Sequence, residues 1–232
     1  RMADLEPGLA GRFTQGLYLP GEGQLDNRGL LLALLHALQS HPRVTLHWHS
    51  ARTPADFDLQ AANAPDWLID CRGLGARDRL RLRGVRGEVI RLHAPDVNLQ
   101  RPTRLLHPRY PIYIAPKPNH LFVIGATEIE SEDLSEASVR STLELLSAAY
   151  TVHPGFGEAR ILEIATQARP TLTDNLPCIT LHSERHISLN GLYRHGFLIS
   201  PAMLDAGLEW MHNQTTEWAL RWGLRVEHEP NH

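Results

Sequence analysis

The chain has 232 residues, of which 42% are hydrophobic and 21% are charged, and its formal net charge is −3. This composition is typical of a globular protein, and the slight acidity argues against nucleic acid or an anionic membrane surface as a partner. No apolar run approaches the roughly 18 residues of a membrane span, so we expect no membrane partner.

Cysteine and histidine content bears on the redox compartment and on metal binding. Cys71 and Cys178 form no CxxC pair and no disulfide framework, so we expect reduced core residues of a cytoplasmic protein. His47 and His49 alternate on an expected strand, and the other histidines show neither an HExxH sequence nor zinc-finger spacing. We therefore expect surface and loop imidazoles in place of a metal site.

The first part of the chain combines strand-like segments with one helix. Residues 13–20 and 44–49 have strand character, and Asp26 or Asn27 is expected to cap a helix that ends before Pro42. The helix carries an apolar stripe of Leu31, Leu34, Leu35 and Leu38. Such a stripe is typical of a helix that packs on a core.

A short apolar run at residues 67–71 meets a glycine turn, Gly73-Leu74-Gly75. A buried strand that ends at such a turn is typical of the ligand-facing edge of an α/β sheet. These two glycines, like Gly21 and Gly23, resemble part of a dinucleotide-binding loop, but both pairs lack the third glycine of GxGxxG. Both pairs are therefore interpreted as turns.

The middle of the chain is expected to form an antiparallel sheet covered by one helix. Strands are expected at residues 85–93, 110–115 and 121–127. Residues 116–120 read as a hairpin connection, and Asp133 with Glu136 resembles a capping box that opens a helix. The expected apolar face of this helix consists of Val139, Leu143, Leu146 and Tyr150.

The last part adds three strands and a terminal helix. The strands are expected at residues 160–167, 178–181 and 186–189. Ser200 is expected to cap a helix that has Pro201 in its first turn and runs towards Trp222. Strands interrupted by single helices indicate an α+β or mixed α/β fold, with a nucleotide-binding layer from the two ends and an antiparallel sheet between them.

Two segments carry groups suited to an anionic ligand. The stretch from Gly191 to Pro201 is a glycine-punctuated loop with Arg194, followed by a helix N-terminus that favours electron-rich atoms. Arg169 ends an expected strand and presents a planar fork suited to a carboxylate, to which the hydroxyl of Tyr113 could also donate. The alternatives are a tight turn in the loop, a surface salt bridge of Arg169 and a packed aromatic side chain at position 113.

Six segments in order carry a family resemblance. They are residues 16–26, 67–77, 83–89, 113–116 with 123–127, 167–170 and 191–201. Together they resemble the FAD-dependent D-amino-acid oxidase and glycine oxidase family, and within it the glycine oxidases of thiamine biosynthesis. The resemblance implies an FAD-binding domain at residues 1–82 and 190–232 and a substrate domain at residues 83–189.

The resemblance also implies an activity and a set of site residues. A full-length enzyme would oxidise the CH–NH2 or CH–NH bond of a small amino acid or amine to an imine, with FAD as cofactor and hydrogen peroxide as product. The implied substrate-binding residues are Arg169, Tyr113 and Arg194. The implied FAD-binding residues are Gly73, Gly191, His195 and Gly196. No catalytic protein base and no metal are implied, and the protein could be a homo-oligomer.

Two departures from the family pattern limit what this chain does alone. Family members hold the FAD pyrophosphate with a strand and a GxGxxG loop, and the chain contains no such loop, so we expect weak FAD binding or none. After Pro201-Ala202 the family often has a small residue and glycine, where this chain has Met203-Leu204-Asp205. The alternatives are a cofactor-free domain with a vestigial pocket or interaction role, and a sarcosine-type or tRNA-modifying flavoenzyme.

Overall fold

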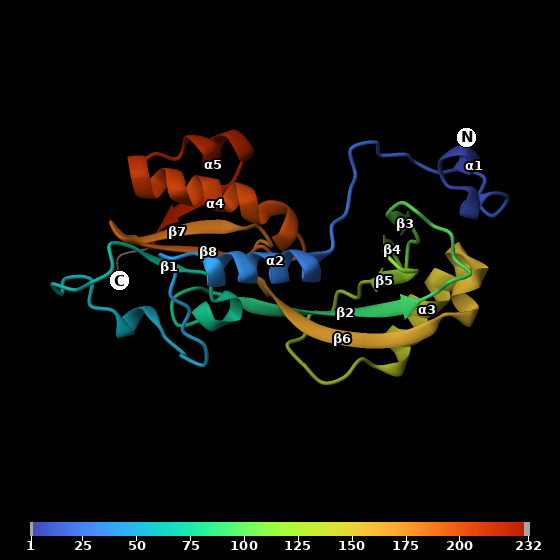
Figure 1. Cartoon of the computed structure of the whole chain (residues 1–232), viewed down its shortest axis with the longest axis horizontal. Helices are drawn as coiled ribbons and strands as arrows, with labels where there is room; N and C mark the ends of the chain where they lie inside the picture. Colours follow the sequence, from blue (N-terminus) through green and yellow to red (C-terminus); the bar gives the residue numbers. More distant parts are fainter. Residues whose placement is uncertain (1, 230–232) are drawn as a thin grey trace. The chain divides into compact units, whose positions relative to one another are not determined.

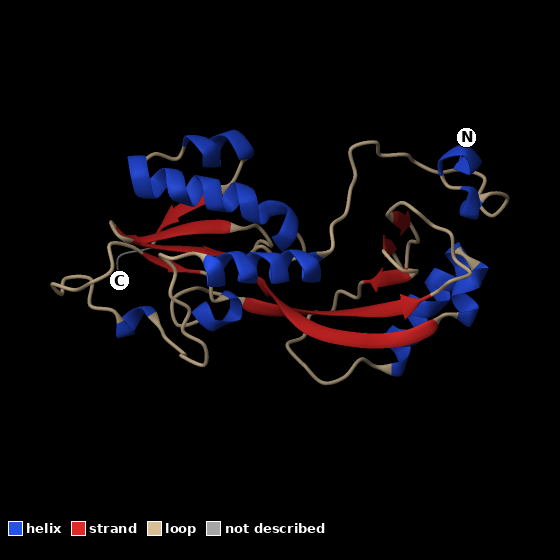
Figure 2. Ribbon diagram, in the orientation of Figure 1, coloured by secondary structure: helices blue, strands red, loops and turns tan. Residues whose placement is uncertain are grey.

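The structure is a computed structural model that describes residues 2–229, and these form two compact units (Figure 1). The five-stranded unit contains the residues up to His36 and Arg86–Ala168, and the four-stranded unit contains Ala37–Val85 and the residues from Arg169 onward. Both units combine a sheet with helices (Figure 2). The predicted α+β, mixed α/β class is therefore confirmed.

The sheet of the five-stranded unit has the order β3-β4-β5-β2-β6, and its first four strands pair antiparallel. The strands are β2 (Arg83–His93), β3 (Thr103–Leu105), β4 (Ile112–Lys117), β5 (Leu121–Gly125) and β6 (Arg160–Thr171). β4 and β5 form the predicted hairpin. Asn119 lies in its turn with a φ of 61°, a left-handed conformation that asparagine tolerates better than most residues.

Helix α3 (Val139–Val152) covers one face of this sheet and completes the core of the unit. The sheet contributes Ile90, Leu92, Ile114, Phe122 and Ile124, and the helix contributes Leu145, Ala148, Ala149 and Val152. Ile114 and Ile124 lie opposite each other in the β4/β5 pair and are fully buried. The sheet and helix of the predicted middle region are thus confirmed.

The predicted start and apolar face of α3 are wrong. The helix begins at Val139 after Ser138, whose hydroxyl accepts the N–H of Ser141, whereas Asp133 accepts the N–H of Ser135 in a turn before it. Three residues of the predicted face, Val139, Leu143 and Tyr150, are more than half exposed. Leu145, Ala148, Ala149 and Val152 face the core instead, whereas Leu146 of the predicted face packs against that core from its edge.

The four-stranded unit has the strand order β1-β8-β7-β9. Its strands are β1 (Leu68–Asp70), β7 (Cys178–Ser183), β8 (His186–Asn190) and β9 (Arg225–His228). β8 runs parallel to β1 and antiparallel to β7, and β9 runs parallel to β7. Helices α4 (Gly196–Asn213) and α5 (Glu217–Trp222) lie on one face of this sheet (Figure 1) and pack on Ile179, Leu181 and Ile187.

The predicted terminal helix needs correction. It begins at Gly196, so Ser200 and Pro201 lie inside α4 and neither caps it. It does not run unbroken to Trp222, because Gln214 takes a left-handed φ of 56° and ends α4 before α5 begins. Strands β3 and β9 were not predicted, since each is only three or four residues long.

Two predicted strands near the start of the chain are absent. Residues 13–20 and 44–49 form loops whose residues pair with no strand among residues 2–229. Helix α2 (Asn27–Ser40) is confirmed, with the Asp26 carboxylate accepting the N–H of Arg28 at 3.2 Å. None of its residues is buried in this chain, so its leucine stripe packs on no core here.

The remaining short helices are α1 (Met2–Leu5), η1 (Pro7–Leu9), η2 (Pro54–Asp56), η3 (Gly73–Ala76) and η4 (Pro154–Glu158). Both cysteines are free, and Cys178 is buried as predicted, but Cys71 is exposed. No helix among the described residues combines the length and the apolar character needed to cross a membrane. Residues 2–229 contain no group of three or more His, Cys, Asp and Glu side chains placed to hold a metal ion.

Candidate functional site

The candidate site lies in the four-stranded unit, at the carboxyl ends of β1 and β8. These strands run parallel, so the turn that follows Asp70 and the loop that follows Asn190 leave the sheet at the same edge. Ligands of open α/β sheets bind at this edge. The parallel pairing therefore brings the predicted Gly73 turn and the predicted Gly191 loop together.

Asn190 joins these two segments, and the sequence alone did not identify it. Its Nδ2 donates to the carbonyl oxygen of Gly73 at 3.0 Å, and its Oδ1 accepts the N–H of Gly191 at 2.8 Å. The residue is only 2% exposed, so both ends of a buried amide are satisfied. The signal available in the sequence was an asparagine that ends an apolar strand directly before a glycine.

The strand end that carries Arg169 is attached to the same loop. The N–H of Tyr193 donates to the carbonyl oxygen of Pro170 at 3.3 Å, and the Thr171 hydroxyl donates to the carbonyl oxygen of Arg169 at 3.0 Å. A Cβ at Gly73 would lie 3.6 Å from Cγ of Pro170, an ordinary contact. The backbone at Arg169 is therefore held beside the Gly73 turn and the Gly191 loop.

Both turns require glycine for conformational reasons. Gly73 has a φ of 57° and Gly191 a φ of 74°, values that L side chains rarely adopt. A Cβ at Gly191 would also lie 2.7 Å from Cδ1 of Leu172, so the Leu172 side chain would have to shift. These backbones can therefore approach a ligand that a side chain would keep away.

The loop after Gly191 ends in the exposed start of helix α4. The carbonyl oxygen of His195 accepts the N–H groups of Leu198 and Ile199, so the N–H groups of Gly196 and Phe197 stand at the helix N-terminus. The first N–H groups of a helix lack acceptors within it and attract electron-rich atoms. Arg194 and His195 are exposed beside this point. Together these donors favour an electron-rich ligand atom at the start of α4.

Tyr113 belongs to the five-stranded unit, whereas Gly73, Arg169 and Gly191 belong to the four-stranded unit. It lies on β4 directly opposite Gly125 on β5. Its ring covers Gly125, where any Cβ would clash with the phenol. The side chain is half-buried. The structure thus fixes the ring of Tyr113 against its own sheet.

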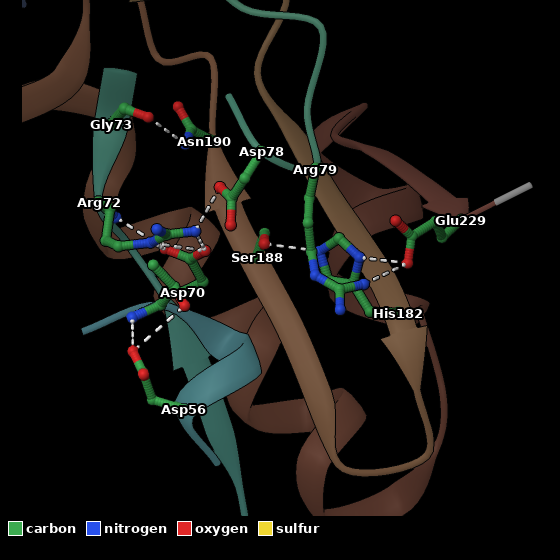
Figure 3. A network of polar contacts seen from close by, with 11 residues as sticks. Asp56, Asp70, Arg72, Gly73, Asp78, Arg79, His182, Ser188, Asn190 and Glu229 are labelled. Carbon is green, nitrogen blue, oxygen red and sulfur yellow. Dashed lines mark hydrogen bonds and ion pairs between the residues drawn. The ribbon is translucent and has the colours of Figure 1, made fainter. Parts of the chain in front are cut away.

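An ion pair stabilises the Gly73 turn. The carboxylate of Asp70, at the end of β1, accepts hydrogen bonds from Nε, Nη2 and the backbone N–H of Arg72, and Arg72 also reaches Asp78 at 2.8 Å (Figure 3). Burial raises the pKa of Asp70, but the bonds from Arg72 outweigh this and hold that pKa below its ordinary value. Asp70 is therefore an ionised carboxylate, and its bonds to Arg72 stabilise the turn that contains Gly73.

A second polar network lies on β7 and β8 and resembles a Ser-His-Glu triad (Figure 3). The Ser188 hydroxyl lies 2.6 Å from Nε2 of His182, whose Nδ1 lies 2.8 Å from the Glu229 carboxylate. Arg79 also bonds Glu229 at 3.2 Å. Ser188 is fully buried within the sheet, so no substrate can reach its hydroxyl. The network therefore holds the segment after β9 on the sheet and is not a nucleophilic site.

The buried side chain of His186 should make the stability of the four-stranded unit depend on pH. It is 5% exposed, and its ring stacks on that of His182 with centroids 4.3 Å apart. Burial, and then the neighbouring His182, lower the pKa of His186 to about 4 from the ordinary 6.5. As pH falls below about 6.5, an unfolded chain binds a proton here that the folded chain refuses, so folding loses free energy. We expect a loss of about 2 kcal/mol between pH 7 and pH 5 from this residue.

The measurement is urea denaturation at both pH values for the wild type, His186→Phe and His47→Phe. Phenylalanine preserves the stacked ring, and Nε2 of His186 has no hydrogen-bond partner within residues 2–229. His186→Phe should remove most of the acid sensitivity, and the exposed His47→Phe should leave it unchanged. Equal pH dependence in all three proteins would refute the assignment.

Comparisons with known proteins show which family the sequence matches. The family described as FAD dependent oxidoreductase (DAO) matches residues 1–204. A Rhizobium etli protein described as a thiamine biosynthesis oxidoreductase, ThiO, is 47% identical over 204 residues, which cover 87% of this chain and 59% of the relative. The glycine oxidase of Geobacillus kaustophilus is 28% identical over 221 residues, which cover 85% of this chain and 56% of the relative. The chain thus spans less than two thirds of these relatives.

Solved structures show the same fold. The crystal structure of glycine oxidase from Geobacillus kaustophilus superimposes with a TM-score of 0.56 at 28% identity, over 66% of this chain and 43% of that one. The iminodiacetate oxidase of Chelativorans sp. BNC1 gives a TM-score of 0.60 at 21% identity, over 70% of this chain and 47% of that one. At that identity the second match concerns the fold alone.

Proposed function

Because the chain belongs to the DAO family of FAD dependent oxidoreductases, we propose that the natural full-length protein containing it oxidises the carbon–nitrogen bond of a small amino acid or amine. The product is an imine, which water hydrolyses. The observation that carries this proposal is the convergence of the Gly73 turn, the Gly191 loop and the Arg169–Pro170 strand end at one sheet edge. Glycine as a substrate is supported by the 28% identical glycine oxidase.

The cofactor in this proposal is FAD. In the proposed reaction the substrate loses a hydride from its carbon and a proton from its nitrogen, and bound FAD would pass these two electrons and two protons to dioxygen to give hydrogen peroxide. Gly73, Gly191, His195 and Gly196 are assigned to the flavin ring, because the glycine backbones carry no side chain that would keep a ligand away and the N–H of Gly196 lies at the start of α4. No protein base is assigned.

The substrate in this proposal is held by its carboxylate. Arg169 binds that group, because a guanidinium offers two parallel donors that match a carboxylate. Arg194, exposed in the loop before α4, is assigned to the junction of substrate and cofactor. Tyr113 is assigned to the substrate because a phenol hydroxyl can donate a hydrogen bond to a carboxylate.

The proposal also assigns residue ranges of the chain to two functional domains. Residues 1–82 and 190–232 are assigned to FAD binding, and residues 83–189 to the substrate domain. The chain contains no GxGxxG loop, so we propose that it holds FAD weakly or not at all when isolated. The two free cysteines favour action in the reducing cytoplasm.

The test is an oxidase assay on the natural full-length protein supplied with FAD. Peroxide release is measured with glycine, sarcosine and iminodiacetate, while bound flavin is counted from its absorbance after dialysis. We expect about one flavin per chain and peroxide release that depends on the amino acid. Absence of both retained flavin and peroxide would instead support the cofactor-free alternative, and activity with an amine that lacks a carboxylate would remove the role of Arg169.

A further inference from the structure

We propose that Asn190 is the positioning residue that keeps the Gly73 turn and the Gly191 loop in register for the cofactor. This inference rests on the proposed function. Asn190 touches neither substrate nor cofactor in the proposal and acts through the two backbones that it joins. Its removal should change how tightly and in what environment the flavin is held.

The amide of Asn190 bonds in two directions. Its NH2 group donates to the carbonyl oxygen of Gly73 at 3.0 Å, and its carbonyl oxygen accepts the N–H of Gly191 at 2.8 Å. An amide supplies a donor and an acceptor side by side, whereas an ionised carboxylate of the same size only accepts. At 2% exposure the residue has little access to water, so a lost bond is not replaced from solvent.

The two groups that Asn190 joins belong to conformationally free positions. Both bonded groups belong to glycines with positive φ, which have the largest conformational freedom of any residue. On the far side of the loop, the Tyr193 N–H donates to the Pro170 carbonyl at 3.3 Å, which is long for such a bond. The amide of Asn190 therefore fixes the distance between the Gly73 carbonyl and the loop that leads to Arg194 and His195.

The substitution Asn190→Asp removes one of the two hydrogen bonds while it keeps the size of the side chain. The carboxylate still accepts the N–H of Gly191 but faces the carbonyl oxygen of Gly73 without a proton to donate. We expect the affinity for FAD at pH 8 to fall by about tenfold or more, together with a shift of the flavin absorbance bands. Lower pH should partly restore affinity, since a protonated carboxyl can donate to Gly73 again. The wild type should lack this recovery.

The experiment titrates FAD into the apo form of the natural full-length protein between pH 5.5 and 8, with thermal unfolding measured in parallel. Asn213→Asp introduces the same charge at the exposed end of α4 and should bind FAD like the wild type. Asn190→Ser, which can keep at most one of the bonds, should weaken FAD binding without the pH-dependent recovery. It also serves as the second variant if the aspartate variant does not fold.

The outcomes separate this inference from the proposed function. A wild type that binds no FAD ends the proposed function, and this inference with it. A wild type that binds FAD, with Asn190→Asp and Asn190→Ser equal to it in affinity and spectrum, overturns the positioning role alone. Lower thermal stability in both variants with unchanged affinity and spectrum also overturns it, because Asn190 would then be a purely structural residue.

Discussion

Arg169→Ala is expected to raise the KM for the amino-acid substrate by roughly ten- to several hundred-fold in the natural full-length protein. A charge-assisted bidentate pair is worth about 1.5–3 kcal/mol, and more when water is excluded. Arg169→Lys should rescue only part of this loss, because an ammonium lacks the planar fork. Tyr113→Phe should cost less, about the value of one hydrogen bond. The flavin spectrum should barely change in the three variants, since these side chains are assigned to the substrate.

The competing interpretation of Arg169 is a structural ion pair, and it makes the opposite forecast. Thermal stability would then fall while KM stays at the wild-type value. Steady-state peroxide assays and thermal unfolding on the same samples decide between the two. Arg160→Ala is the matched control, because Arg160 begins the same strand β6 and is exposed. An unchanged KM for Arg169→Ala would end the assignment.

The elements that the sequence predicted well are those whose pattern is local. The hairpin of β4 and β5 combines alternating apolar residues with a turn at Pro118-Asn119-His120, so neighbouring residues specify the whole unit. β1 was recognised because an apolar run ends at the Gly73 turn. Gly73 and Gly191 were chosen for their place in turns, and both take positive φ.

The failures have a common physical cause, which is dependence on distant partners. Residues 13–20 carry apolar side chains of strand type, but a strand forms only where a neighbouring strand accepts its hydrogen bonds. Leucines in α2 and α3 read as core stripes, whereas packing buries the smaller Ala148 and Ala149 and leaves Leu143 exposed. A sequence pattern shows that one face of a helix is hydrophobic, but it does not show which part of the protein covers that face.

The candidate site shows the same limit at the level of single residues. The bond from Asn190 to Gly73 joins residues 117 positions apart, and it exists because β8 pairs parallel with β1. Neither Asn190 nor the Glu229 partner of His182 lies in a local pattern that predicts such a bond. Sequence reasoning found the turns and the charged fork of Arg169, and tertiary structure supplied the residue that joins the turns.

A buried ion pair in the five-stranded unit should have the largest effect on stability. Arg86 and Glu88 are 5% and 1% exposed, and Nη2 of Arg86 lies 2.7 Å from Oε1 of Glu88. Arg86 also donates to the carbonyl oxygens of Asp133 and Glu136, so it ties the segment before α3 to the sheet. The carboxylate of Glu88 accepts the Thr127 hydroxyl at 3.1 Å. Removal of the guanidinium would therefore leave a buried charge and two carbonyl groups without this donor.

We expect Arg86→Met to lower the free energy of unfolding by about 3–5 kcal/mol, measured by urea denaturation at pH 7, because breaking a buried pair strands its partner. Burial raises the pKa of Glu88, but its hydrogen bonds, including those from Ser141 and Arg86, outweigh this and lower it, so the carboxylate stays charged until the pH is acidic. The double variant Arg86→Met/Glu88→Leu should recover much of the loss, since two apolar side chains leave no unpaired charge.

The matched control is the exposed pair of Arg28 and Glu163, whose charged groups lie 2.7 Å apart and whose side chains are 56% and 37% exposed. Arg28→Met breaks this pair and should lower the free energy of unfolding by less than about 1 kcal/mol. Equal losses for Arg86→Met and Arg28→Met would show that burial does not set the strength of the Arg86–Glu88 pair.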